Sequence, residues 1–250
     1  MTPTPLLLLH AFPLDHRLWD DVVAALPPGQ PVVAPDVPDA DVLGGRPSLE
    51  DAADRVAAQL HAAGHARVVV AGLSMGGYVA LALAERHPGL VAGLGLLDTR
   101  STADAPEAAA RRLATADAVD AAGSVDPVRG AVAGLLGGTT RTGRPQVEER
   151  VGAWVDEQPP ARVAWSQRAM ASRPDRTPVL RAFAGPVLVV VGAEDEVTGP
   201  EHAQHMAAAS ATARLVVVPG AGHLTAVEAP APVAAALAEL VARTDATPPR

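Results

Sequence analysis

Short runs of purely apolar residues alternate along this chain with longer stretches in which apolar residues recur every three or four positions. The short runs predict strands buried on both faces, and the longer periodic stretches predict helices. We expect strands at 6–9, 32–34, 67–72, 91–97, 186–191 and 214–218. We expect helices at 15–26, 49–63 (with Ser48 as its N-cap), 75–87, 200–210 and 229–243. This alternation predicts an α/β fold, a mostly parallel sheet with helices on both faces.

The alternation stops between residues 101 and 181. That segment has helical patterns at 105–122, 127–136, 146–157 and 160–172, and no convincing strand pattern. The sequence therefore predicts one discontinuous α/β core of residues 1–100 and 182–244. It also predicts an inserted all-helical segment of residues 101–181 and a flexible tail of residues 245–250.

Composition narrows the chemistry that the chain can perform. It contains no Cys and no Lys, which excludes a cysteine nucleophile, a thiolate-bound metal and a lysine Schiff base. Its formal net charge of -8 disfavours binding to nucleic acid or to anionic lipid. No apolar run approaches the roughly 18 residues of a membrane span, and the first residues lack the basic region of a signal peptide. We therefore expect a cytoplasmic protein without a nucleic-acid or membrane partner.

One serine stands between glycines where a predicted strand meets a predicted helix. The segment Gly72-Leu73-Ser74-Met75-Gly76 fits the pattern G-x-S-x-G in the strand-turn-helix context that this pattern requires. In such a corner the serine hydroxyl projects at the sheet edge, close to a helix N-terminus. The backbone N–H of Met75 can then point at a developing oxyanion. The pattern predicts Ser74 as a nucleophile.

A serine hydroxyl needs a general base, and the base needs an orienting acid. Asp195 follows the predicted strand at 186–191, and His223 follows the one at 214–218. Because the carboxyl ends of parallel strands meet at one edge of a sheet, both side chains are expected beside Ser74. Asp98 also follows a predicted strand and is the alternative acid, although we favour Asp195.

The chain is similar to the α/β-hydrolase superfamily over nearly its whole length. The matching segments are 8–15 (LLHAFPLD), 72–77 (GLSMGG), 192–200 and 220–224, with Ser, Asp and His in the family's chain order. The resemblance is nearest to small bacterial esterases and to enol-lactonases of the 3-oxoadipate enol-lactonase type. It implies that the helical insertion is the cap that such enzymes carry.

The resemblance implies Ser74 as nucleophile, His223 as general base and acid, and Asp195 as the orienting carboxylate. It also implies an oxyanion hole made by the backbone N–H groups of Phe12 and Met75. The family's usual His-Gly is replaced here by His-Ala at residues 10–11. A positive φ at the alanine would be strained and would displace the N–H of Phe12.

Several other side chains have two interpretations. His10 is expected to brace the oxyanion loop and could border the substrate pocket. Trp154, Trp165 and Met170 of the insertion either line an apolar pocket or attach the insertion to the core. The insertion has 11 Arg and 10 acidic residues, which favours either an anionic substrate or a solvated surface.

His202 and His205 lie three residues apart on one predicted helix, but no further ligands accompany them in a convincing pattern. We interpret them as surface residues, and we expect neither a metal ion nor another cofactor.

The sequence therefore predicts a serine hydrolase that cleaves carboxylic esters or lactones of small molecules. The same fold and triad could instead perform acyl transfer, cofactor-free perhydrolysis of the haloperoxidase type, or C–C bond hydrolysis. A non-catalytic ligand-binding receptor is the least favoured alternative. We expect a monomer rather than a homo-oligomer.

Overall fold

Six parallel strands form one sheet at the centre of the molecule, in the order β2-β1-β3-β4-β5-β6. The structure is a computed structural model, and it describes residues 3–38 and 45–247. The strands are β1 (Leu6–Leu9), β2 (Val32–Val33), β3 (Val68–Leu73), β4 (Val91–Leu97), β5 (Val187–Gly192) and β6 (Ala213–Val218). All six predicted strands are confirmed within two residues at each end, and so is the parallel sheet.

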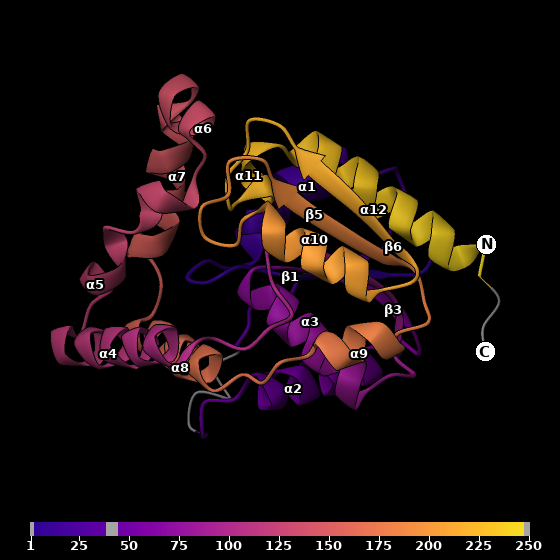
Figure 1. The fold of residues 1–250 in the computed structure, drawn as a ribbon, viewed down its shortest axis with the longest axis horizontal. Helices are drawn as coiled ribbons and strands as arrows, with labels where there is room; N and C mark the ends of the chain where they lie inside the picture. Colours follow the sequence, from indigo (N-terminus) through magenta and orange to yellow (C-terminus); the bar gives the residue numbers. More distant parts are fainter. Residues whose placement is uncertain (1–2, 39–44, 248–250) are drawn as a thin grey trace.

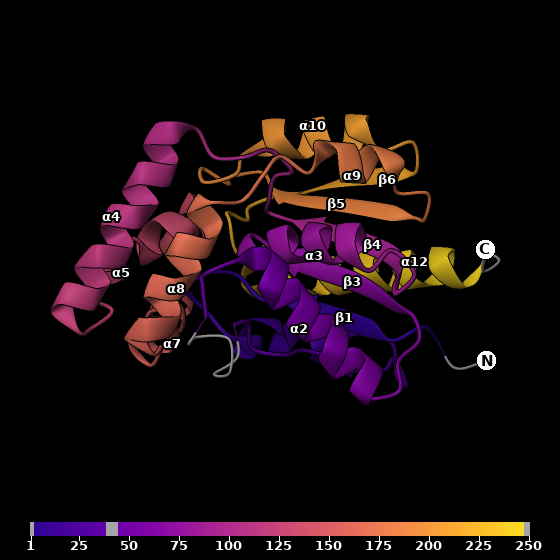
Figure 2. The ribbon, with the colours of Figure 1, turned by 90° about the horizontal axis from the view of Figure 1, so that it is seen from below.

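Helices cover both faces of this sheet (Figures 1 and 2). One face is covered by α1 (Asp20–Ala25) and α12 (Pro230–Asp245), and the other by α2 (Leu49–Ala62), α3 (Met75–Arg86) and α10 (Pro200–Ala209). Side chains of a strand alternate between the two faces. Leu6 and Leu8 accordingly pack into one apolar cluster, and Leu7 and Leu9 pack into the other. A strand buried on both sides must be apolar at every position, which explains the run of four leucines.

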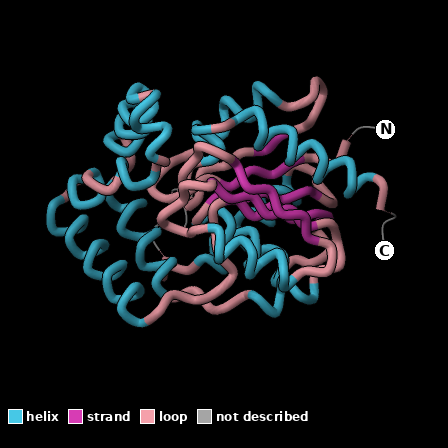
Figure 3. The backbone as a smooth tube through the Cα atoms, turned by 45° about the horizontal axis from the view of Figure 1, so that its top comes forward, coloured by secondary structure: helices cyan, strands magenta, loops and turns pink. Residues whose placement is uncertain are grey.

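The chain between β4 and β5 is helical. It forms α4 (Pro106–Ala122), α5 (Asp126–Arg129), η2 (Val132–Leu135), α6 (Gly138–Gly143), α7 (Pro145–Asp156), α8 (Pro160–Ala171) and α9 (Thr177–Ala182). Figures 1 and 3 show most of these helices at the end of the sheet opposite the two chain termini. Because β1 starts near the N-terminus and all strands are parallel, this is the end where the strands' carboxyl ends lie.

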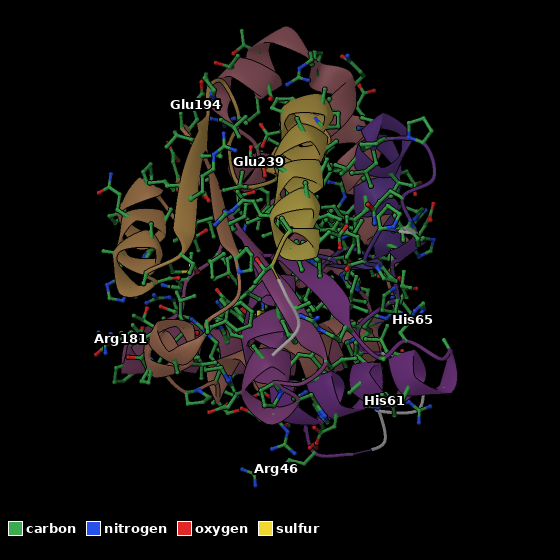
Figure 4. All side chains as sticks on the ribbon, turned by 90° about the vertical axis from the view of Figure 1, so that its right-hand side faces the viewer. Arg46, His61, His65, Arg181, Glu194 and Glu239 are labelled. Atoms are coloured by element: carbon green, nitrogen blue, oxygen red, sulfur yellow. The ribbon has the colours of Figure 1, made fainter. Side chains whose placement is uncertain are left out.

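Polar contacts attach the insertion to the core. The Arg17 guanidinium lies 2.5 Å from Glu157, and Arg150 lies 2.9 Å from Asp21. Figure 4 shows Glu194, of the loop after β5, beside the helical segment at the top of that view, where its carboxylate accepts from the backbone and hydroxyl of Thr139. The insertion is therefore bound to core loops at several separate points.

Several boundaries differ from those that the sequence predicts. The helix expected at 15–26 is a short 3-10 helix, η1 (His16–Trp19), followed by α1, because the Asp15 side chain caps a separate first turn. The helix expected at 127–136 is divided into α5 and η2, with Gly130 at the break. Three short helices were not expected, namely α6, α9 and α11 (Thr225–Glu228).

The last helix also runs further than expected. It ends at Asp245, and its Thr244 is buried and donates a hydrogen bond to the carbonyl of Leu240. Asp245 itself accepts hydrogen bonds from Thr4. Of the tail predicted at 245–250, residues 248–250 lie outside the described residues. No helix in the described ranges is long and apolar enough to cross a membrane.

The corner between β3 and α3 packs directly on β1. A Cβ placed on Gly76 would lie 2.0 Å from the carbonyl oxygen of Leu9, and one placed on Gly72 would lie 2.1 Å from that of Gly76. Both glycines are therefore required for backbone-to-backbone approach and not for a turn conformation.

We predict that Gly76→Ala destabilises the protein by about 1–3 kcal/mol or more, because the added methyl group overlaps the backbone of β1. Gly89→Ala is the matched control, since a Cβ there would meet no atom within 4 Å. Urea unfolding of both variants measures the difference. Equal stabilities would show that the corner can open without cost.

Candidate active site

Ser74 stands at the corner with an unusual backbone conformation. Its φ of 53° and ψ of -111° lie outside the regions that side-chain-bearing residues prefer, and such a residue costs on the order of 1–3 kcal/mol. Two neighbours fix it: the Ser74 N–H donates to Leu97 O at 2.9 Å, and the Thr99 hydroxyl donates to Ser74 O at 2.8 Å. The corner therefore holds the serine side chain in one place.

The structure brings together the three residues that the sequence singles out. The Ser74 hydroxyl lies 2.9 Å from Nε2 of His223. On the other side of the ring, Nδ1 lies 3.0 Å and 3.1 Å from the two carboxylate oxygens of Asp195. An ionised carboxylate can only accept, so Nδ1 carries the proton and Nε2 is left to accept from the serine hydroxyl. This geometry lets the imidazole receive the serine proton.

Asp195 is buried and held as an anion. Burial alone would raise its pKa, but the hydrogen bond with His223 and those from the N–H groups of Thr198 and Val197 together hold the pKa below its ordinary value. Those two N–H groups lie 2.9 Å and 2.8 Å from Oδ1, and the Thr198 hydroxyl donates to Oδ2 at 2.9 Å. The sequence does not predict the contribution of Thr198, because a threonine three residues after an aspartate carries no signal of its own.

Asp98, the alternative acid, makes different contacts. It accepts from the N–H of Gly192 at 3.0 Å and from the N–H and hydroxyl of Thr225 at 3.1 Å and 2.5 Å. Its side chain is fully buried, and burial together with the nearby charge of Asp195 raises its pKa well above the ordinary value. Asp98 therefore joins two loops, whereas Asp195 contacts the histidine.

Glu228 is a buried residue of this region that sequence reasoning misses. Its Oε1 accepts from the N–H groups of Gly222 and Leu224, at 2.9 Å and 3.2 Å, on either side of His223. Its Oε2 accepts from the N–H of Gly137 in the helical insertion, at 2.9 Å. One carboxylate thus ties the histidine loop to the insertion. No local sequence signal marks this role, because Gly137 lies 91 positions away.

The loop after β1 is not strained at its alanine. Among the described residues other than glycine, positive φ occurs at Ser74 and Asp98, so Ala11 has an ordinary conformation and the expected strain is absent. His10 braces this loop from within. Its Nδ1 lies 3.0 Å from Ala11 O, and its Nε2 accepts from the Val37 N–H at 2.8 Å. Burial lowers the pKa of His10, which fits a neutral ring with its proton on Nδ1.

A small cavity adjoins the two predicted oxyanion donors. It has a volume of about 10 Å³, room for about one water, and Phe12, Met75 and His10 line it. The N–H of Met75 opens α3 and so has no acceptor within the helix. Helix α8 and the residue pair before it close the other side through Gln158, Arg162 and Ser166.

Three of the predicted pocket residues lie elsewhere and do not line this cavity. Trp165 and Met170 are buried in the apolar cluster around α3, because they are on the side of α8 that packs on the core. Trp154 of α7 lies between the guanidinium groups of Arg17 and Arg150, 5.8 Å and 5.1 Å from its ring centre. Their contacts attach the insertion to the core, and that they line a substrate pocket stays a prediction.

One group of side chains in the described residues has metal-ligand spacing, namely Asp15, His16 and Asp36. Its ligand atoms already have partners: Asp15 binds the Arg17 guanidinium, and His16 Nδ1 lies 2.9 Å from Asp36. His202 lies 3.8 Å from Glu201, and His205 lies 3.3 Å from the Thr177 hydroxyl. These two histidines therefore have separate neighbours.

Comparison with known proteins gives consistent results. A family model described as the alpha/beta hydrolase fold matches residues 4–230. The chain is 30% identical over 238 residues to the pimeloyl-[acyl-carrier protein] methyl ester esterase of Neisseria meningitidis, a match that covers 86% of this chain and 84% of that protein.

Solved structures agree with this result. A thermophilic esterase from Thermogutta terrifontis, with malate bound, has a TM-score of 0.90 and 34% identity, and the match covers 97% of this chain and 91% of that one. The enol-lactonase from Burkholderia xenovorans has a TM-score of 0.78 at 22% identity, with 96% and 92% covered, and so shows likeness of fold.

The raised pKa of Asp98 predicts a pH effect on stability. The folded protein keeps a proton that the unfolded chain releases above about pH 3.9. It therefore loses stability as the pH rises from that value through the folded-state pKa. Asp98→Asn keeps a neutral polar group that tolerates the local φ of 43°, and it removes this loss.

The unfolding free energy of Asp98→Asn should therefore rise relative to the unmutated protein as the pH increases above about 4, by up to about 1.4 kcal/mol per pH unit. Urea unfolding at several pH values measures this difference. A difference that is constant with pH would mean that Asp98 is ionised in the folded protein.

Glu228→Gln tests the link between the histidine loop and the insertion. Glutamine can keep one acceptor oxygen but turns an N–H donor towards a second backbone N–H. We expect a loss of about 1–3 kcal/mol in unfolding free energy and faster amide hydrogen exchange at Gly137. Glu149→Gln, at an exposed position on α7, should change stability by no more than about 0.5 kcal/mol. Matching effects of the two substitutions would contradict a role for Glu228 in joining these segments.

Proposed function

The chain belongs to the α/β-hydrolase fold family, and we propose that it is a serine hydrolase that cleaves carboxylic esters or lactones of small molecules. The observation that carries this proposal is the continuous array in which the Ser74 hydroxyl lies 2.9 Å from His223 and His223 lies 3.0 Å from buried Asp195. The relatives named as esterases support the same reaction class.

In the proposed reaction, Ser74 Oγ attacks the ester carbonyl carbon while His223 Nε2 takes the serine proton. The carbonyl oxygen becomes an oxyanion, which accepts hydrogen bonds from the backbone N–H groups of Phe12 and Met75. When the intermediate collapses, His223 returns its proton to the leaving alkoxide, and an alcohol and an acyl-serine result.

Deacylation repeats these steps with water. His223 takes a proton from a water molecule, and the oxygen of that water attacks the acyl carbonyl. Collapse of the second intermediate breaks the bond to Ser74 Oγ, which recovers its proton from His223, and a carboxylic acid is released. No cofactor takes part. Asp195 stays ionised throughout and stabilises the imidazolium that forms twice in each cycle.

We assign the orienting role to Asp195 and not to Asp98. Asp195 contacts the histidine ring and has a lowered pKa, whereas Asp98 contacts Thr225 and Gly192 and has a raised one. An acid that stabilises an imidazolium must be ionised at the working pH. We also propose that the helical insertion, residues 101–181, acts as a cap, because its helix α8 contributes to the cavity beside Met75.

Stopped-flow hydrolysis of p-nitrophenyl butyrate tests the function. We expect turnover by the unmutated protein and a loss of on the order of 10⁴–10⁶-fold in kcat for Ser74→Ala. Asp195→Asn should lose about 10⁴-fold, because the imidazole then favours the wrong tautomer. Ser124→Ala, which alters a serine that contacts Asp126 in the insertion, is the control and should keep full activity.

Equal activity of Ser74→Ala and the unmutated protein would remove Ser74 from the mechanism. A burst of one p-nitrophenol per protein without turnover, relieved by an added alcohol, would indicate acyl transfer and not hydrolysis.

A further inference from the structure

The segment directly after β4 holds both backbone groups of Ser74. The N–H of Ser74 donates to Leu97 O at 2.9 Å, and the hydroxyl of Thr99 donates to Ser74 O at 2.8 Å. Thr99 is buried, and its segment is itself anchored, because the N–H of Asp98 donates to Val190 O of β5 at 2.9 Å. The Thr99 hydroxyl is therefore held in a fixed place.

Thr99 makes the shortest of the hydrogen bonds to the Ser74 carbonyl oxygen. The backbone N–H groups of Gly77 and Tyr78, in the first turn of α3, lie 3.0 Å and 3.4 Å from the same oxygen. Thr99 also packs on that turn, since a Cβ placed on Gly77 would lie 2.6 Å from both Cγ2 and Oγ1 of the threonine. The start of α3 therefore lies directly against this side chain.

The Ser74 carbonyl and the Met75 N–H are the two polar groups of one peptide unit. A trans peptide is planar, so its C=O and N–H bonds point in opposite directions. Rotation of this unit about the line between its Cα atoms would swing both groups together. A hydrogen bond that fixes the Ser74 carbonyl therefore also fixes the direction of the Met75 N–H, which is one of the two proposed oxyanion donors.

The other proposed donor, the N–H of Phe12, has the same arrangement. Its peptide unit contains the Ala11 carbonyl, whose oxygen lies 3.0 Å from Nδ1 of buried His10 and accepts from the Leu14 N–H at 2.9 Å. In both peptide units a buried side chain holds the carbonyl that points away from the expected oxyanion. The two units belong to different loops, so the arrangement occurs twice independently.

We propose that Thr99 is a positioning residue of the oxyanion hole, because its hydroxyl holds the Ser74 carbonyl and so directs the Met75 N–H at the oxygen on which negative charge develops. This inference rests on the proposed function and adds a residue to it. When Ser74 Oγ attacks, the electron pair of the carbonyl π bond moves onto that oxygen, and a donor already directed there needs no reorientation. Thr99 touches no reacting atom and acts only through the peptide unit.

Two esters that differ in one atom test this role. In p-nitrophenyl butyrate the negative charge develops on oxygen. In the thionoester, which has C=S in place of C=O, it develops on sulfur, a weaker hydrogen-bond acceptor. Both release p-nitrophenol, whose absorbance gives kcat/KM for each ester. A change in the oxyanion donors alters the ratio of the two values, whereas a general loss of active protein lowers both equally.

Thr99→Val keeps the shape of the side chain and removes the hydroxyl. We expect kcat/KM for the oxygen ester to fall by about 10- to 100-fold, less than the roughly 10²–10³-fold loss when an oxyanion donor is removed outright. The value for the thionoester should stay within about threefold. Thr99→Ser, which keeps the hydroxyl, should retain the ratio of the unmutated protein.

Thr244→Val is the matched control. Thr244 is also buried, and its hydroxyl also donates to a backbone carbonyl, that of Leu240, at 2.8 Å. It belongs to the last turn of α12, and this helix ends beside the chain termini, at the end of the molecule opposite the helical insertion (Figure 1). The control should therefore keep the ratio of the two esters, whatever its stability.

A second pair of variants covers the case in which Thr99→Val does not fold. Thr99→Ala and Thr99→Ser both lose the methyl group and differ only in the hydroxyl. The ratio of oxygen ester to thionoester should be about 10-fold or more lower in Thr99→Ala than in Thr99→Ser. Circular dichroism at the assay temperature checks that each variant is folded.

A trifluoromethyl ketone gives a measurement that needs no turnover. The serine hydroxyl adds to its carbonyl carbon, and the resulting hemiketal oxygen resembles the oxyanion of the transition state, which such analogues bind more tightly than substrates do. We expect its inhibition constant to rise by about 10-fold or more in Thr99→Val and to stay unchanged in Thr244→Val.

The outcomes separate the two proposals. If Thr99→Val lowers kcat/KM for both esters equally, or changes neither, Thr99 does not position the Met75 N–H, while the hydrolase function stands. If Thr99→Ser loses the ratio as fully as Thr99→Val does, the methyl group and not the hydroxyl is responsible, and the inference is wrong. If the unmutated protein cleaves neither ester, the proposed function fails and the inference fails with it.

Discussion

The contact of the β3–α3 corner with strand β1 is the constraint on which the rest of the site depends. Gly76 lies so close to the carbonyl of Leu9 that helix α3 must begin directly against the sheet. The chain then has one residue in which to turn, and Ser74 takes a φ of 53° to do so. That strain, on the order of 1–3 kcal/mol, is maintained only because buried apolar residues on both faces of the sheet hold the two elements in place.

His223 stands on a loop after β6, so packing between a strand and a helix does not fix its position. Its position depends on polar contacts from distant parts of the chain. The His223 N–H donates to Leu135 O at 3.1 Å, and Glu228 joins the flanking residues of that loop to Gly137. Because Leu135 and Gly137 belong to the helical insertion, that insertion helps to fix the geometry between Ser74 and His223. It is therefore a structural part of the site.

The sequence predicts those features that depend on local pattern. Continuous apolar runs identify all six strands, and the glycines around Ser74 identify the corner, because each reflects a constraint carried by a few consecutive residues. Glu228 contacts Gly137, 91 positions away, and the Thr198 hydroxyl lies 3.2 Å from Nδ1 of His223, 25 positions away, so no local pattern reveals these contacts. Composition places Trp154, Trp165 and Met170 in the insertion, but the side of a helix that faces the cavity beside Met75 is decided by packing, and these three side chains do not line it.

The two buried aspartates near His223, Asp98 and Asp195, have pKa values shifted in opposite directions. Burial and the nearby charge of Asp195 raise the pKa of Asp98, whereas the histidine and two backbone N–H groups lower the pKa of Asp195. The two pKa directions agree with the contacts of each side chain: Asp195 accepts from the His223 ring, and Asp98 accepts from Gly192 and Thr225.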